Sequence, residues 1–218
     1  MSYITNGTTN WMQQLPSYGS GAFTMMTWIK VLAWGDGDIP LIHQYSNPAG
    51  TGYDIWATNA GVLKIVNGGG TTTGSTISTG TWYHLAVTSI ANVGSSDPWL
   101  LYLNGVLDAT ENWWGSYAVT VLYLGTESGT TYTNAKYAYS RAFNVTMSAA
   151  QIVAEMNSAT AVASSPAFDS DLATALGPWQ GINSPTQDAE MPTLGGATTC
   201  AVTGTLNGAT EANVVGGT

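Results

Sequence analysis

Paired carboxyl groups are the first feature of this sequence that could do chemistry. A retaining glycosidase needs two carboxyl groups about 5–5.5 Å apart, one as acid and one as nucleophile. Asp36 and Asp38 are two positions apart, as are Asp169 and Asp171, but both pairs stand in turn-like sequence and not in a strand. The glutamates are scattered along the chain, at positions 111, 127, 155, 190 and 211. These spacings argue against a glycosidase.

A nucleophile activated by histidine is the second possible chemistry. Serine–histidine–aspartate triads are recognised by geometry, but the sequence contains no nucleophile elbow. The only histidines, His43 and His84, stand in strand-like runs, where a packed histidine is the ordinary interpretation. Cys200 is the only cysteine, which excludes an intrachain disulfide and a cysteine zinc cluster. The sequence therefore predicts no catalytic residues.

Adjacent tryptophans offer a binding surface instead. Trp113 and Trp114 are neighbours, and neighbouring residues of a strand point to opposite faces, so only one of them can enter a core. An exposed indole binds sugar rings and anchors protein interfaces, because it is a rigid apolar plate with one polar N–H. Weaker versions of this argument apply to Trp34, Tyr53, Trp56 and Trp99. We expect Trp34, Tyr53, Trp113 and Trp114 to bind a ligand; the alternative is that both adjacent tryptophans pack under a loop.

The composition indicates a polar surface with little charge. Charged residues make up 8% of the chain, and 4 basic against 13 acidic residues give a net charge of −9. Nucleic-acid binding requires clustered lysine and arginine, which this chain lacks, so nucleic acid is not an expected partner. With 44% apolar residues, 9 Trp and 11 Tyr, the chain can build a large core without a disulfide.

Short β-branched and aromatic runs, separated by clusters of Gly, Asn, Ser and Pro, must position these residues. This pattern is typical of an antiparallel sandwich. Asn104-Gly105 favours a type I′ hairpin, and Ser148 and Gln151 have the spacing of a capping box before a helix that reaches Met156. We predict an all-β fold of two stacked antiparallel sheets with one short helix. The clearest strands are expected at residues 23–31, 52–57, 62–66, 82–89, 99–103, 119–124 and 136–143, and the strand at 82–89, apolar on both faces, should be central.

Several phrases of the sequence are specific enough to indicate a family. The strongest are GTWYHLAVT at residues 80–88 and LYLNG at residues 101–105. FTMMTWIK precedes them at 23–30, and YSRAF at 139–143 runs on into MSAAQI at 147–152. In this order they resemble the laminin G-like members of the concanavalin A-like lectin and glucanase superfamily, over roughly residues 20 to 157.

The resemblance implies a jelly-roll sandwich, which we place at residues 1–157. It also implies a metal site, because laminin G-like domains often bind calcium at a loop rim, and Asp36 and Asp38 supply two hard oxygen ligands on a glycine-rich loop. Since calcium prefers six to eight oxygens, Asp54 or Asp97 would have to come close. A solvated turn without metal is the alternative, and no other cofactor is expected. The Glu-x-Asp-x-Glu pattern of the superfamily's glucanases is absent, so no enzyme is predicted.

Residues 158–218 follow the trailing helix as a C-terminal extension. Prolines at 166, 178, 185 and 192 argue against a second sandwich, while the apolar residues among them argue against a free tail. We expect the extension to pack on its own sandwich or on a neighbouring subunit, where Trp179 would be the interface anchor. The chain is therefore expected to form a homo-oligomer or to be part of an assembly.

Two functions remain open at this stage. In the favoured one, the chain is a non-catalytic structural protein of a bacteriophage virion surface, a capsid decoration or fibre component that contacts other virion subunits and also binds glycans. In the alternative, it is a free bacterial lectin-like carbohydrate-binding protein. No signal peptide and no apolar run of about 18 residues stands in the sequence, so we expect synthesis in a host cytoplasm, no membrane insertion and a final place on the virion surface.

Overall fold

The computed structural model describes residues 2–9, 11–14, 22–45, 53–67, 70–89, 98–112, 121–127, 131–159, 168–169, 180–182 and 186–194. Its strands are β1 (Ser2–Asn6), β2 (Trp11–Gln14), β3 (Phe23–Ala33), β4 (Ile39–Tyr45), β5 (Tyr53–Ala57), β6 (Val62–Asn67), β7 (Gly70–Thr76), β8 (Tyr83–Ser89), β9 (Pro98–Leu103), β10 (Val106–Asn112), β11 (Val121–Leu124), β12 (Thr126–Glu127), β13 (Thr131–Tyr132), β14 (Asn134–Phe143), β15 (Phe168–Asp169), β16 (Gln180–Ile182) and β17 (Thr186–Asp188). The described part also holds one helix, α1 (Ala149–Met156).

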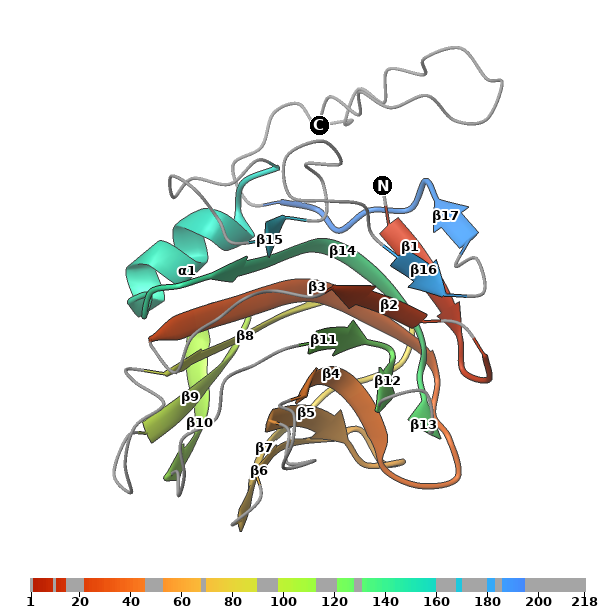
Figure 1. Cartoon of the computed structure of the whole chain (residues 1–218), viewed down its shortest axis with the longest axis horizontal. Coiled ribbons are helices and arrows are strands. Elements are labelled where there is room, and N and C mark those ends of the chain that lie inside the picture. Colours follow the sequence, from red (N-terminus) through yellow and green to blue (C-terminus); the bar gives the residue numbers. More distant parts are fainter. Residues whose placement is uncertain are drawn as a thin grey trace.

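The strands form two stacked antiparallel sheets, which confirms the predicted sandwich. The eight-stranded sheet has the order β10-β9-β8-β3-β14-β1-β17, with β15 beside β14. The seven-stranded sheet has the order β16-β2-β11-β4-β5-β6-β7, and β12 pairs with β13 in a separate ribbon. In Figure 1 the eight-stranded sheet arches over the seven-stranded sheet, and α1 lies on the far side of the arch. Each sheet therefore has an inner face in the core and an outer face.

The core lies between the sheets, and β8 is central in its sheet, as predicted. Leu85 and Val87 are fully buried in the main apolar cluster, together with Ile42 and Ile55 of the opposite sheet. Ala86, of opposite parity, belongs to a second cluster on the outer face, beneath Ile152 of α1. Because both faces of β8 are covered, this strand carries apolar residues at consecutive positions.

Helix α1 begins and is held as its sequence indicates. The predicted capping box is present: the Ser148 side chain accepts from the Gln151 backbone, and the Gln151 side chain accepts from the Ser148 backbone. At the other end, the buried guanidinium of Arg141 on β14 donates to the Glu155 carbonyl at 3.0 Å, to the Glu155 carboxylate at 3.2 Å and to the Ser158 carbonyl at 3.1 Å. Arg141 thus satisfies the carbonyls that a helix end leaves free. No helix in the described part is long and apolar enough to cross a membrane.

The turn between β9 and β10 is the predicted type I′ hairpin. Asn104 has φ 51° and Gly105 has φ 81°, the positive values that this turn requires at both central residues. The Asn104 side chain also accepts from the His84 backbone N–H at 2.9 Å. A Cβ at Gly105 would lie 2.6 Å from Cγ2 of Val153, so the turn rests directly against α1.

Side chains join β7 and β10, the edge strands of the two sheets. Asp108 accepts from the Ser75 backbone N–H at 2.9 Å and from the Ser75 hydroxyl at 2.5 Å, and Glu111 accepts from the Thr72 hydroxyl. Gly74 makes this approach possible, because a Cβ there would lie 2.1 Å from Oδ2 of Asp108. This side of the sandwich is therefore closed by carboxylates that cross from one sheet to the other.

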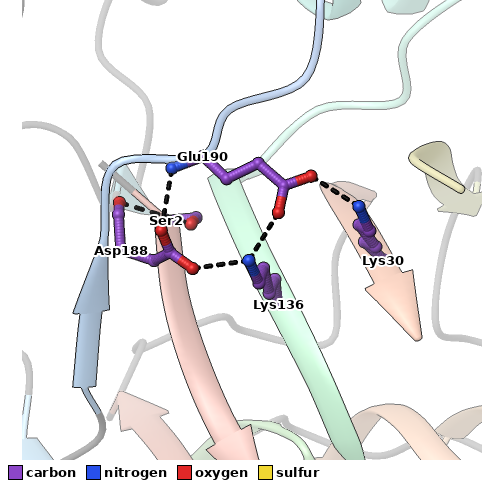
Figure 2. A network of polar contacts seen from close by, with 5 residues as sticks. All are labelled: Ser2, Lys30, Lys136, Asp188 and Glu190. Atoms are coloured by element: carbon purple, nitrogen blue, oxygen red, sulfur yellow. Dashed lines mark hydrogen bonds and ion pairs between the residues drawn. The ribbon is translucent and has the colours of Figure 1, made fainter. Parts of the chain in front are cut away.

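The described residues after 158 add strands to both sheets. β15 pairs with β14, β16 with β2 and β17 with β1. Figure 2 shows how the segment after β17 is fastened to the outer face of the eight-stranded sheet: Lys136 lies 2.5 Å from both Asp188 and Glu190, and Lys30 lies 2.5 Å from Glu190. Asp188 and Glu190 are a further pair of acids two positions apart, and the structure uses them as ion-pair partners of lysine. Whether the division at residue 157 separates two domains stays a prediction.

Candidate functional site

The outer face of the seven-stranded sheet carries polar and aromatic side chains that are buried or half-buried. On β5, Ile55 and Ala57 are buried in the core, so Asp54 and Trp56, of opposite parity, belong to the outer face. The same alternation puts Lys64 on the outer face of β6, between the buried Leu63 and Ile65. Register then decides which of these residues are neighbours, because directly opposed side chains are about 4.5–5.5 Å apart.

One row of this face is built around a histidine–carboxylate pair. His43 on β4 is opposite Asp54 on β5 and opposite Tyr123 on β11. Nδ1 of His43 contacts Oδ1 of Asp54 in a hydrogen bond, and the imidazole stacks on the Tyr123 ring with centroids 5.6 Å apart. His43 is 3% exposed and Asp54 is 8% exposed. Asp54 thus orients the ring and fixes which nitrogen donates to it.

The adjacent row holds an indole between a proline and a lysine. Trp56 is opposite Pro40 on one side and Lys64 on the other. The lysine ammonium lies 2.6 Å from the carboxylate of Asp38, which is in the loop directly before β4. Trp56 is half-buried, and its indole N–H is enclosed without a hydrogen-bond partner. This N–H is not open to a ligand, so what the residue can offer is the partly exposed face of its ring.

The arrangement suits binding better than bond cleavage. Trp56 and Tyr123 present partly exposed rings, and the Lys64–Asp38 pair supplies accessible polar atoms, while the His43–Asp54 pair is buried. Among the described residues, Asp54 on this face and Asp38 in the loop beside it each contact a basic side chain and do not form a couple with each other. A retaining glycosidase needs its two carboxyl groups to face one another across the bond that is cut.

The clearest pKa shifts lie away from this face and have structural causes. Burial, and then the nearby Arg141 charge, lowers the pKa of His84 to about 3. Burial raises the pKa of Tyr137 in the core. The hydrogen bonds between Lys136 and its acidic partners raise the pKa of the lysine and lower the pKa of Asp188 and Glu190. Shifted values of this kind mark packing and ion pairing as often as they mark chemistry.

The predicted site residues fall in several places. Trp34 is partly buried against the main core and close to Gly61. Tyr53 pairs with Gln44 in the ladder of β4 and β5, and its side chain lies outside the described part. Asp36 and Asp38 are exposed in the loop before β4, and the described residues contain no group of three or more His, Cys, Asp or Glu that could hold a metal. Four predicted site residues lie outside the described part, and they are Asp97, Trp113, Trp114 and Trp179. The predictions for these residues stay predictions.

Sequence reasoning missed the two rows themselves. It treated His43 as a packed histidine, and Asp54 only as an extra metal ligand. Both are buried, but they contact each other across β4 and β5. Strand parity does indicate that His43, Asp54 and Trp56 avoid the core, since the residues between them are apolar. Parity alone does not say which strands are adjacent, so the pairing required the register.

A family model described as the concanavalin A-like lectin/glucanases superfamily, of laminin G type, matches residues 6–153. The match begins before the first phrase that suggested the resemblance, and it includes most of the described strands. No curated protein matches the chain significantly.

Solved structures share the architecture at low sequence identity. A Trypanosoma rangeli sialidase matches with 13% identity and a TM-score of 0.52, over 61% of this chain but only 22% of the sialidase. The heptameric SAP-like pentraxin of Limulus polyphemus matches with 15% identity and a TM-score of 0.55, over 69% of this chain and 79% of the pentraxin. A Bacteroides ovatus protein to which carbohydrate binding is ascribed matches with 19% identity and a TM-score of 0.54, over 69% and 45% of the two chains. At these identities the likeness shows the fold alone.

Proposed function

This chain belongs to the concanavalin A-like lectin/glucanase superfamily, and from that premise we propose that it is a non-catalytic, lectin-like domain that binds glycans on the outer face of its seven-stranded sheet. The observation that carries the proposal is the juxtaposition of the partly exposed rings of Trp56 and Tyr123 with the accessible Lys64–Asp38 pair, beside the buried His43–Asp54 hydrogen bond that holds the neighbouring row in place. A sugar ring has an apolar face of C–H groups and a rim of hydroxyls. An aromatic plate beside fixed polar atoms matches both.

The partly exposed ring of Trp56 supports the same proposal. Its indole N–H is enclosed, so the ring face is the part on which a sugar can stack. Burying a whole aromatic side chain contributes about 1.5–3 kcal/mol, so burying the exposed remainder of a half-buried ring contributes about 1 kcal/mol, which corresponds to about fivefold in affinity.

A glycan array followed by isothermal titration tests the proposal. The variant Trp56→Ala should bind the recognised glycan about fivefold more weakly or worse. Trp82→Ala is the matched control, because Trp82 is also half-buried, also has an enclosed indole N–H without a partner, and packs on the outer face of the other sheet. If both variants bind as the parent does, the site is elsewhere; if no glycan binds the parent, the function is wrong.

The absence of catalysis is tested separately. We expect no release of reducing sugar from neutral or acidic polysaccharides, because the described residues of the proposed surface contain no couple of carboxyl groups that faces a glycan. Activity that disappears on replacement of a single acid would overturn this part of the proposal. The sialidase likeness does not argue against it, since the match spans a minor part of that enzyme.

We also propose the setting that the sequence favours, a virion surface on which the domain acts as capsid decoration or fibre component. Its support is the weakly charged, Thr- and Gly-rich composition. Mass spectrometry of purified virions and the identity of neighbouring genes test it. Neighbouring genes for polysaccharide enzymes would instead favour the alternative, a free bacterial lectin.

A further inference from the structure

The basic side chains of this protein are few enough to be followed one by one. The sequence holds 4 lysine and arginine residues in 218 positions, and all four lie in the described part of the chain. A ligand that carries carboxylate, sulfate or phosphate is ordinarily recognised by such side chains. Their partners therefore decide whether the protein can offer a cation to a ligand.

Three of the four basic side chains form ion pairs on the eight-stranded sheet. Lys30 and Lys136 are held by Glu190 and Asp188 on its outer face, with contacts of 2.5 Å (Figure 2). Arg141 is 1% exposed and paired with Glu155 beneath α1. None of these three is on the seven-stranded sheet, where we propose that glycans bind.

Lys64 is the one lysine or arginine of the proposed binding face, and it too is paired with a carboxylate, while His43 is buried against Asp54. Its ammonium lies 2.6 Å from the Asp38 carboxylate, and its side chain is 23% exposed. Asp54 adds a further carboxylate to the same face. With the net charge of −9 for the whole chain, the potential at this face opposes an approaching anion.

We infer that the glycan bound on the outer face of the seven-stranded sheet is uncharged, and that its acidic counterparts are rejected. The inference rests on the proposed function and narrows its ligand class. An acidic sugar docked here would give up water without gaining a cationic partner, since each of the four basic side chains already has a carboxylate. A neutral sugar also gives up water in the same place, but the cost is much smaller, because hydroxyls carry no charge and need only hydrogen-bonding groups and an aromatic surface.

A printed array of neutral oligosaccharides, each beside the same oligosaccharide carrying sialic acid or sulfate, tests the inference with the full chain. We expect the acidic member of each pair to bind about tenfold more weakly or worse, and the neutral member to bind equally at low and high salt. Equal or stronger binding of the acidic members overturns the inference while leaving glycan binding in place. No binding of either member overturns the proposed function as well, so the two failures are distinguishable.

The variant Asp38→Asn examines the cause directly. It releases Lys64, so the difference between acidic and neutral glycans should shrink about threefold to tenfold. Asp36→Asn is the matched control, because it removes the same charge two residues away without touching that lysine. Both residues are exposed, and melting curves verify that both variants remain folded. Equal effects of the two variants, or no effect of Asp38→Asn, would show that the pairing of Lys64 does not set the selectivity.

Discussion

The ion pair beneath α1 permits a prediction with a defined magnitude. The side chains of Arg141 and Glu155 are 1% and 2% exposed, so neither charge can be satisfied by water if the other is removed. Glu155→Gln keeps the volume and an acceptor oxygen but removes the negative charge that contacts the guanidinium. Breaking a buried pair in this way costs about 3–5 kcal/mol. In a chain of this size, that cost lowers the melting temperature by about 6–20 °C.

Calorimetry of the variant beside Glu190→Gln measures this cost. Glu190 undergoes the same chemical change, but its side chain is 38% exposed, so water can replace it and the expected loss is about 0–1 kcal/mol. The double variant Arg141→Met, Glu155→Gln removes both charges and should lose less than the sum of the single changes. Equal melting temperatures for Glu155→Gln and Glu190→Gln would refute the argument from burial.

Three further predictions concern other parts of the molecule. The low pKa of His84 means that the unfolded chain takes up a proton below about pH 6.5 that the folded chain refuses, so stability is highest above that pH. The free energy of unfolding from urea titrations should fall by about 2 kcal/mol between pH 7 and pH 5, and His84→Gln should abolish that fall. Gly105→Ala should lower the free energy of unfolding by about 1–2 kcal/mol more than Gly80→Ala does in the same assay. Both glycines have positive φ, but only a Cβ at position 105 would meet a side chain of α1, so equal losses would contradict the contact. Melting curves with calcium and with chelator should coincide, because Asp38 is engaged by a lysine; a gain of about 2.7 kcal/mol at a hundredfold excess over Kd would instead establish that Asp36 and Asp38 hold the ion.

Local signals in the sequence were reliable for this fold. The capping box at Ser148, the hairpin at Asn104 and the doubly apolar strand β8 are each decided by residues close together in the chain, and the structure confirms all three. β7 is different: Gly70–Thr76 alternates between exposed and half-buried polar residues, because an edge strand needs no apolar face. Its pairing with β6 cannot be predicted from periodicity.

The candidate site depended on contacts that periodicity does not encode. His43 and Asp54 meet because β4 and β5 are in one register, and a β-bulge between Pro40 and Ile42 contributes to that register. A slip of one residue would send Asp54 into the core and Ile55 outward. Lys136 and Glu190 are 54 positions apart, so the ion pairs of Figure 2 depend on where the chain returns. Residue types predicted a binding protein, and the face that we propose for binding could be described only from the assembled sheets.

The carboxylates that join β7 to β10 also affect how copies of this protein behave together. The free edge of a sheet is a template on which another extended chain can add its own strand, and long exposed edges lead to aggregates. The Asp108 carboxylate accepts a hydrogen bond from the Ser75 backbone N–H, and an incoming strand would need this N–H as a donor. The register shift between Leu107 and Ala109 bends the other edge away from regular pairing. A protein with few charged residues to keep its copies apart can therefore be concentrated without its sheets growing into one another.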